Sequence, residues 1–201
     1  MLIWLNGPFG GGKTQTAYEL RRRLPGAVVC DPELVGFGLQ HTIPRGLRPD
    51  FQTLASWRSG VVEVLDHTLR AHAGPVIAPM TLVEPAYFDE IIGGLRGLGH
   101  DVRHFALVAP ADVVRRRLRG RTLGGLRPGG ARWALDQVDR CLDALVGPEF
   151  AEHVDTARHS VTEVADLVAS RCDLPIATDH DGPLRGRLRR ATVHLHHVRM
   201  G

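Results

Sequence analysis

The sequence predicts an α/β fold in which a parallel β-sheet carries helices on its faces. An apolar run at residues 2–5 leads directly into a glycine-rich segment at residues 7–14, and a helical pattern follows. Further β-rich runs, separated by helical patterns, lie at residues 27–30, 75–79, 104–108 and 154–156. Alternating strands and helices are typical of a parallel sheet. The 201 residues suffice for one domain with a core of its own.

The glycine-rich segment predicts a phosphate-binding loop, because residues 7–14 match the pattern G-x-x-x-x-G-K-[ST]. They lie between a buried strand and a helix expected over residues 15–24, which is the context that the motif requires. Glycines let consecutive N–H groups turn toward an anionic phosphate, and the following helix adds the positive end of its dipole. The prediction is therefore a P-loop NTPase fold: a five-stranded parallel sheet flanked by helices, nucleotide-kinase-like and with a lid.

The residue types in this segment suit the triphosphate of ATP bound together with Mg²⁺, and these are the expected cofactors. Lys13 is the only lysine among 25 lysine and arginine residues, and its compact ammonium reaches outer phosphates where a planar guanidinium fits poorly. The Thr14 hydroxyl is the expected ligand of Mg²⁺. Lys13 is also a candidate catalytic residue. The candidate nucleotide-binding residues of this segment are Gly7, Pro8, Phe9, Gly10, Gly11, Gly12, Lys13, Thr14 and Gln15.

Two carboxylates, Asp31 and Glu33, follow the second expected strand at residues 27–30. Ligands of open α/β sheets bind at the carboxyl edge of the strands. A carboxylate there accepts the proton of a substrate hydroxyl or holds Mg²⁺ through water, as phosphoryl transfer requires. Asp31 is therefore a candidate catalytic and substrate-binding residue, and Glu33 is a candidate substrate contact. The alternative role of Asp31 is a helix cap, because Asp-Pro-Glu is also a good helix start.

A substrate-side region is expected after these carboxylates. Residues 34–39 have a helical pattern, residues 41–50 are irregular, and residues 51–73 carry the apolar face of one long helix. Trp57 belongs to that face and is expected in the core. Arg58 beside it is a candidate substrate contact, with a solvated arginine as the alternative.

The third expected strand, at residues 75–79, is followed by Thr81, a candidate substrate contact at the same sheet edge. In many nucleotide-binding sheets an acidic residue ends this strand and supports Mg²⁺. No acidic residue occurs here before Glu84, so either Asp31 takes that place or the metal site is unusual. A helix face at residues 88–98 precedes the fourth strand.

An arginine-rich helix is expected over residues 112–121, leading into a Gly/Pro-rich segment that is typical of a mobile lid, at about residues 118–132. Arg117 and Arg121 are four residues apart and share a helix face, so one guanidinium would stack on a purine while the other binds phosphate. Both are candidate catalytic and nucleotide-binding residues. Arg140, on a helix expected over residues 131–145, is a candidate substrate contact from the other side of the lid. The alternative is a solvated, charged helix face.

Composition bounds the class of protein. Hydrophobic residues make up 43% and charged residues 23% of a chain with formal net charge +3, as in soluble globular proteins. Three cysteines without metal spacing, the lack of a signal-peptide pattern and the lack of a membrane-spanning apolar run predict a cytoplasmic protein with reduced thiols. No nucleic-acid partner is expected, and the oligomeric state stays open.

The chain is expected to divide into a kinase-like domain over residues 1–175 and a basic amphipathic segment over residues 176–201. A helix at residues 161–171 ends the domain pattern. From Leu184 to Val198, apolar residues recur at steps of four and three, and arginines and histidines fill the other faces. Such a helix either lies on an anionic membrane surface, as a peripheral contact, or packs its narrow apolar stripe on the protein body.

Seven short segments carry a family resemblance. They are Ile3-Trp4-Leu5-Asn6-Gly7-Pro8-Phe9-Gly10, Gly12-Lys13-Thr14-Gln15-Thr16-Ala17, Asp31-Pro32-Glu33, Pro79-Met80-Thr81, His104-Phe105, Arg117-Leu118-Arg119 and His197-Val198-Arg199. In this order and over nearly the full length, they resemble the tunicamycin-resistance ATP-binding protein family. The resemblance implies a P-loop fold of the nucleoside-monophosphate-kinase type, ATP binding, resistance to a nucleoside antibiotic and peripheral membrane association through the C-terminal segment. The stretch from Arg117 to Arg121 is similar to the lid of adenylate-kinase-like enzymes, in which two such arginines contact the adenine ring and the phosphates.

Three functions compete at this point. The first is an ATP-dependent phosphotransferase acting on a hydroxyl of a nucleoside antibiotic, with Asp31 orienting or deprotonating that hydroxyl and the arginines neutralising the phosphoryl group. The second is an ATP-binding protein that sequesters the antibiotic unmodified, which the missing acidic residue after the third strand favours. The third is a metabolic small-molecule kinase.

Overall fold

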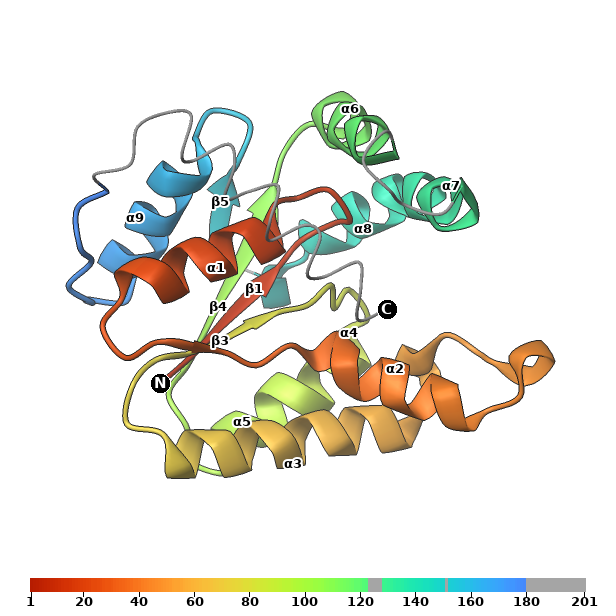
Figure 1. The fold of residues 1–201 in the computed structure, drawn as a ribbon, viewed down its shortest axis with the longest axis horizontal. Helices are drawn as coiled ribbons and strands as arrows, with labels where there is room; N and C mark the ends of the chain where they lie inside the picture. Colours follow the sequence, from red (N-terminus) through yellow and green to blue (C-terminus); the bar gives the residue numbers. More distant parts are fainter. Residues whose placement is uncertain (123–127, 151, 180–201) are drawn as a thin grey trace.

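Five parallel strands form the centre of the molecule (Figure 1). The computed structural model describes residues 1–122, 128–150 and 152–179. The strands are β1 (Leu2–Asn6), β2 (Val28–Val29), β3 (Val76–Pro79), β4 (Val102–Val108) and β5 (His153–Asp155). Their order in the sheet is β2-β3-β1-β4-β5, and every neighbouring pair is parallel. The predicted α/β fold with a five-stranded parallel sheet is therefore confirmed, and all strands end at one edge.

The strand β1 is central because its side chains are apolar on both faces. Leu2 and Trp4 face one core cluster, Ile3 and Leu5 face the other, and all four are 0% exposed. Successive side chains of a strand point to opposite faces of the sheet. A strand of this composition is stable only where helices cover both faces.

Two helices, α1 (Lys13–Arg23) and α9 (Val161–Arg171), cover one face of the sheet (Figure 1). Ala17 and Leu20 of α1 pack with Val164 and Val168 of α9 in the same buried cluster as Ile3 and Leu5. α9 begins with a capping box, in which Ser160 and Glu163 each accept the backbone N–H of the other. The helix that follows the phosphate loop is thus supported by the last helix of the described chain.

The opposite face is covered by α3 (Ala55–Ala71) and by the helical stretch α4 (Pro85–Phe88), η3 (Asp89–Gly93) and α5 (Gly94–Gly97). Trp57 of α3 is completely buried there, as predicted, and its indole N–H donates to the carbonyl of Pro32 at 3.0 Å. That bond ties α3 to the start of α2 (Pro32–Thr42). Two short 3₁₀ turns, η1 (Arg45–Leu47) and η2 (Phe51–Thr53), connect α2 with α3.

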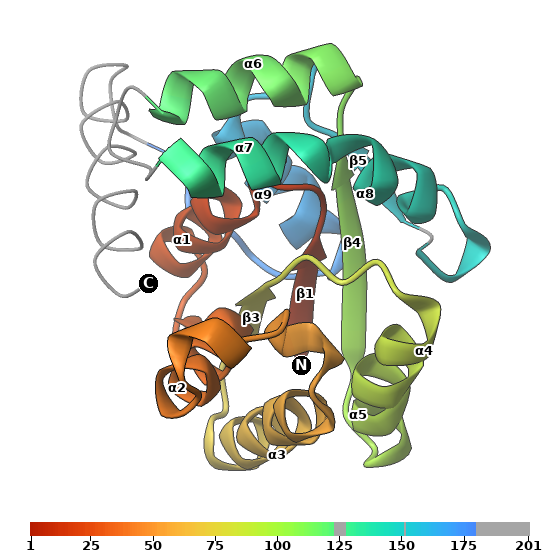
Figure 2. The same ribbon diagram turned by 90° about the vertical axis from the view of Figure 1, so that its right-hand side faces the viewer.

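A third group of helices consists of α6 (Ala111–Thr122), α7 (Pro128–Asp136) and α8 (Val138–Leu145), followed by the turn η4 (Pro148–Phe150). They share a small apolar cluster whose buried members are Ala109, Val114, Leu118, Ala134 and Val138. Figure 2 shows α6 and α7 side by side next to the loop between β1 and α1. Residues 123–127 of the expected lid lie outside the described part of the chain, so the lid stays a prediction.

Three of the expected helices are divided into shorter segments, and a local hydrogen bond defines one of these segments. Residues 51–53 form a separate turn because Asp50 caps it, accepting the N–H of Gln52 at 3.0 Å, and Leu54 then returns to an extended backbone. The helix expected over residues 131–145 is interrupted at Gln137, between α7 and α8. The helix expected over residues 88–98 contains the π-helical turn η3, which ends at the pair Gly93 and Gly94.

The chain after α9 returns to α1. The N–H of Ala177 donates to the carbonyl of Arg23 at 3.0 Å, and Asp179 pairs with Arg22 at 2.8 Å. The contacts with the body of the protein therefore extend to Asp179. A domain boundary at residue 175 stays a prediction. The amphipathic C-terminal helix also stays a prediction, because residues 180–201 are not among those described. Within the described ranges, no helix has the length and apolar character that a membrane crossing needs.

Candidate nucleotide-binding site

The loop between β1 and α1 has the backbone that the motif requires. Gly10 and Gly12 have φ values of 83° and 100°, in the left-handed region that favours glycine. The N–H of Gly11 donates to the carbonyl of Pro8 at 2.9 Å and closes the turn. Gly12 is the N-cap of α1, so Lys13, Thr14 and Gln15 form the first helical turn. The first N–H groups of a helix point out of its end, which makes this turn an anion-binding site.

The loop also packs closely on α6. A Cβ added at Gly10 would approach Leu118 Cγ at 2.9 Å and the carbonyl of Val114 at 3.2 Å. Glycine at this position thus serves a second purpose besides its φ value, because only a residue without a side chain lets the loop contact α6 at this distance. The arginine-rich helix α6 therefore packs directly against the phosphate loop.

Lys13 lies folded onto its own loop. Its ammonium donates to the carbonyls of Gly7 at 3.0 Å and Pro8 at 3.1 Å, and it lies 5.5 Å from the centroid of the Phe9 ring. The side chain is only 8% exposed. A buried ammonium needs such acceptors, and an anionic phosphate is a stronger partner than a neutral carbonyl.

Two polar side chains fix the loop to the end of β3. Asn6 accepts the N–H groups of Gly7 at 2.8 Å and Leu82 at 2.9 Å and donates to the carbonyl of Leu82 at 2.6 Å. The Thr81 hydroxyl donates to the carbonyl of Gly7 at 2.9 Å. Asn6 and Thr81 are both buried. The strand end that carries a metal-binding carboxylate in other sheets is occupied here by groups that hold the phosphate loop.

The donor set for Mg²⁺ is small but of the right chemistry. Thr14 is half-buried in the first turn of α1, where the motif places the hydroxyl ligand of the ion. The described residues contain no cluster of three or more His, Cys, Asp or Glu side chains that could hold a metal ion. Mg²⁺ in phosphoryl-transfer sites takes most of its oxygen ligands from phosphates and water, so a single hydroxyl fits this role.

Asp31 has the capping role that was considered for it. Its Oδ1 accepts the N–H of Glu33 at 3.0 Å, which makes it the N-cap of α2. It also follows β2 at the sheet edge where β1 leads into the phosphate loop. This edge is where the sequence predicted a base or a substrate contact. Glu33 lies half-buried in the first turn of α2, and both substrate contacts stay predictions.

Among the arginines, Arg117 has the most defined position. Its guanidinium donates to the hydroxyl of Thr156 at 3.0 Å and to the carbonyl of Thr156 at 2.6 Å, and burial lowers its pKa. This joins α6 to the carboxyl end of β5. The side chain of Arg121 lies outside the described residues. Arg140 is exposed on α8 and donates to Gln137 at 2.8 Å. Nucleotide contacts by these arginines stay predictions.

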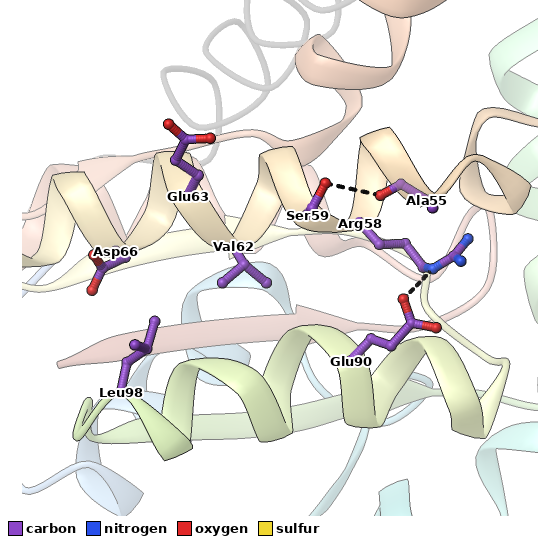
Figure 3. Close-up of a pocket in the computed structure, with 8 residues that line it drawn as sticks. All are labelled: Ala55, Arg58, Ser59, Val62, Glu63, Asp66, Glu90 and Leu98. Atoms are coloured by element: carbon purple, nitrogen blue, oxygen red, sulfur yellow. Dashed lines mark hydrogen bonds and ion pairs between the residues drawn. The ribbon is translucent and has the colours of Figure 1, made fainter.

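Arg58 reaches the phosphate loop only through other residues. Its guanidinium pairs with Glu90 at 2.5 Å and lies 4.3 Å from the centroid of the Tyr87 ring. Arg58 also lines a groove of about 470 Å³, which α3 forms together with Glu90 and Leu98 (Figure 3). It also donates to the carbonyl of Gln52 at 2.8 Å, and the Gln52 amide donates to the carbonyl of Thr81 at 2.8 Å. A substrate contact by Arg58 stays a prediction, because its partners in the structure are protein groups.

Sequence reasoning missed three elements of this site: Asn6, the Arg117–Thr156 pair, and the contact between Phe9 and Trp133 of α7, whose ring centroids are 4.9 Å apart. A polar residue at the end of an otherwise apolar strand was a usable signal for Asn6. No local pattern indicates the other two, because their partners are distant in the chain.

The fold and the loop together define the class: this is a P-loop protein with the fold of small-molecule kinases. The family model of the AAA domain matches residues 2–144. The solved tunicamycin resistance protein of Deinococcus radiodurans is 35% identical, with a TM-score of 0.74 and coverage of 89% of this chain and 98% of that one. The chain therefore belongs to the AAA-domain family and to the tunicamycin-resistance protein family, as the resemblance predicted.

Two further solved structures share the fold at lower identity. A sugar kinase from Janibacter sp. HTCC2649 is 20% identical, with a TM-score of 0.60 and coverage of 89% of this chain and 98% of that one. The shikimate kinase of Bacteroides thetaiotaomicron is 18% identical, with a TM-score of 0.59 and coverage of 87% and 99%. Likeness at this identity concerns the fold alone. No curated protein sequence matches the chain.

Proposed function

We propose that the protein is an ATP-dependent phosphotransferase that acts on a hydroxyl of a nucleoside antibiotic of the tunicamycin type and so confers resistance. The observation that carries the proposal is the position of Asp31, at the end of β2, on the sheet edge where β1 leads into the phosphate loop. A base and a phosphate-binding loop on one edge are what hydroxyl phosphorylation requires. The similarity to the tunicamycin resistance protein supports the choice of substrate class.

The reaction assigns a task to each part of the site. The loop N–H groups and Lys13 bind the outer phosphates of ATP, and the Thr14 hydroxyl would hold Mg²⁺, which when bound neutralises phosphate charge. The acceptor hydroxyl oxygen attacks the γ-phosphorus, the bond to the β–γ bridging oxygen breaks, and ADP leaves. Asp31 takes the hydroxyl proton on its carboxylate. Arg117, which is bonded to Thr156, and Arg121 would share the purine and phosphate contacts, one guanidinium stacking on the purine and the other binding phosphate.

The experiment is to incubate the purified protein with ATP, Mg²⁺ and tunicamycin and to measure the mass of the antibiotic. A gain of about 80 Da, one phosphoryl group, supports the proposal. Asp31→Asn provides the sharper test, because Asn caps a helix as well as Asp but is no base. Asp50→Asn is the matched control, since Asp50 caps η2 through an equivalent bond of 3.0 Å. Loss of the adduct in Asp31→Asn alone identifies the base, and an unchanged rate in that variant contradicts the role.

A second function, sequestration of the antibiotic without modification, is favoured by one observation. The end of β3 carries no carboxylate, and its Thr81 and Leu82 hold the phosphate loop instead. Tight binding of tunicamycin with no change in its mass supports sequestration. If tunicamycin is neither bound nor modified while ATP is bound, a kinase of another small metabolite is the remaining candidate.

A further inference from the structure

The Phe9 ring of the phosphate loop lies between Lys13 and a tryptophan of α7. On one side, the Lys13 ammonium is 5.5 Å from the ring centroid. On the other, Trp133 meets Phe9 edge to face, with centroids 4.9 Å apart and an interplanar angle of 64°. The three side chains form a continuous row from α7 to the ammonium that binds phosphate.

The middle of this row and its Lys13 end have further contacts. Phe9 is half-buried and packs against the apolar cluster of α6, α7 and α8 that includes Val114 and Leu118. Lys13 donates to the carbonyls of Gly7 and Pro8, the two residues that precede Phe9 in the loop. Trp133 is 48% exposed, so its indole is accessible from solvent. Its defined contact is the Phe9 ring.

We propose that Trp133 is a positioning residue for nucleotide binding: it fixes the Phe9 ring, and the ring fixes the ammonium of Lys13 in line with the outer phosphates. The proposal rests on the proposed function only in assuming that the loop binds ATP. α7, which follows the expected lid, then sets the affinity of the loop for a triphosphate.

ATP binding is expected to change the partners of the Lys13 ammonium. The ammonium leaves the carbonyls of Gly7 and Pro8 for the phosphates, which are the stronger acceptors. The ammonium also contacts the face of Phe9, an attraction that depends on the direction of the ring face. The edge-to-face contact with Trp133 determines that direction. Without the indole the Phe9 ring keeps only its packing against the apolar cluster, so the direction of its face toward the ammonium is less restricted in the bound state.

The test compares three variants in one helix by calorimetric titration with ATP and Mg²⁺. Trp133→Leu should weaken ATP binding about three- to tenfold, the range of one aromatic or cation–π contact. Trp133→Phe, which keeps an aromatic edge, should restore affinity to within about twofold. Leu135→Ala is the control, because Leu135 packs against the same cluster and has no ring. It should lower the melting temperature and leave ATP affinity unchanged.

Fluorescence supplies a readout that packing alone would not change. The chain has three tryptophans, and the other two, Trp4 and Trp57, are 0% exposed. ATP should therefore change the emission of the wild type and of Leu135→Ala, and the change should vanish in Trp133→Phe.

The outcomes distinguish a failure of the proposed function from a failure of the inference about Trp133. Failure of the wild type to bind ATP overturns both the proposed function and this inference. If the wild type binds ATP, the inference alone is overturned by wild-type affinity in Trp133→Leu, by equal weakening in Leu135→Ala, or by a full emission change in Trp133→Phe.

Discussion

Lys13 and Thr81 donate to the same oxygen, the carbonyl of Gly7, at 3.0 Å and 2.9 Å. The two donors differ in what happens to them when a phosphate binds. Lys13 is expected to turn to the phosphate, whereas Thr81, fixed at the end of β3, keeps its bond. The Gly7 carbonyl therefore retains a partner in both states, and the loop has its binding shape before the nucleotide arrives.

Replacement of the lysine tests the central assumption of nucleotide binding. Lys13→Ala should weaken ATP binding at least about tenfold, because a charge-assisted hydrogen bond to phosphate is lost. Equilibrium titration with a fluorescent ATP analogue measures the loss. Arg21→Ala, an exposed cation on the same helix, is the control and should bind as the wild type does. Wild-type affinity in Lys13→Ala would exclude nucleotide binding by this loop.

Removal of the Thr81 hydroxyl should weaken ATP binding about two- to tenfold, the effect of one neutral hydrogen bond. In Thr81→Val the Gly7 carbonyl loses its second donor, and the loss matters most when Lys13 is bound to phosphate. Thr81→Ser should restore affinity because it keeps the donor. Thr53→Val, which removes an exposed hydroxyl bonded to Asp50 at 2.7 Å, is the control. Equal affinities of Thr81→Val and the wild type would contradict this account of the loop.

Arg23 joins α1 to the end of the described chain. It is 4% exposed, pairs with Asp166 at 2.5 Å and donates to the carbonyl of Ala177 at 2.7 Å. Arg23→Ala should lower the free energy of unfolding by about 2 kcal/mol, because the charge-assisted hydrogen bond of the buried guanidinium to Asp166 and its bond to Ala177 are lost. Arg22→Ala, whose ion pairs are more exposed, should cost less than about 1 kcal/mol. Urea denaturation of both variants measures the difference, and similar losses would contradict the prediction.

The burial of the Cys172 thiol predicts that the folded protein loses stability at alkaline pH. Burial raises the pKa of this thiol from the ordinary 9.0 to about 11. The folded state therefore keeps a proton that the unfolded state releases, so the contribution is fully present below about pH 9 and is lost as pH rises toward 11. A pKa rise of this size corresponds to at most about 3 kcal/mol in the free energy of unfolding. Urea denaturation at pH 8 to 11 should show a smaller decline in Cys172→Ala, and parallel declines would refute the assignment.

The sequence predicted what local patterns determine. β1, β3 and β4 are apolar runs buried on both faces, and such runs have few alternatives in an α/β protein. The phosphate loop is a continuous motif, so its position and the helix after it followed from one segment. Asp31 was recognised from its place after a strand, and the helix cap that the Asp-Pro-Glu sequence also predicted is confirmed by the bond from the Glu33 N–H.

The remainder depends on partners far apart in the chain. Asn6 bonds to Leu82, which is 76 residues away, and Arg117 bonds to Thr156, which is 39 residues away. No periodicity encodes such pairs, because they exist only after the sheet has formed. The split of the helix expected over residues 51–73 involves a local bond that helical periodicity also hides, because Asp50 caps the start of a separate turn without disturbing the apolar pattern.

The order of synthesis gives the pairing of α1 with the last helix a consequence in the cell. The phosphate loop and α1 leave the ribosome first. Arg23 can form its contacts with Asp166 and Ala177 only after these residues, 143 and 154 positions later, have been synthesised. Long-range contacts of this kind form late, and a nascent chain exposes its apolar strand and helix until they do. A premature stop before residue 161 therefore removes the support of the first helix as well as the last helix itself. We expect such fragments to be bound by chaperones or degraded rather than to bind nucleotide.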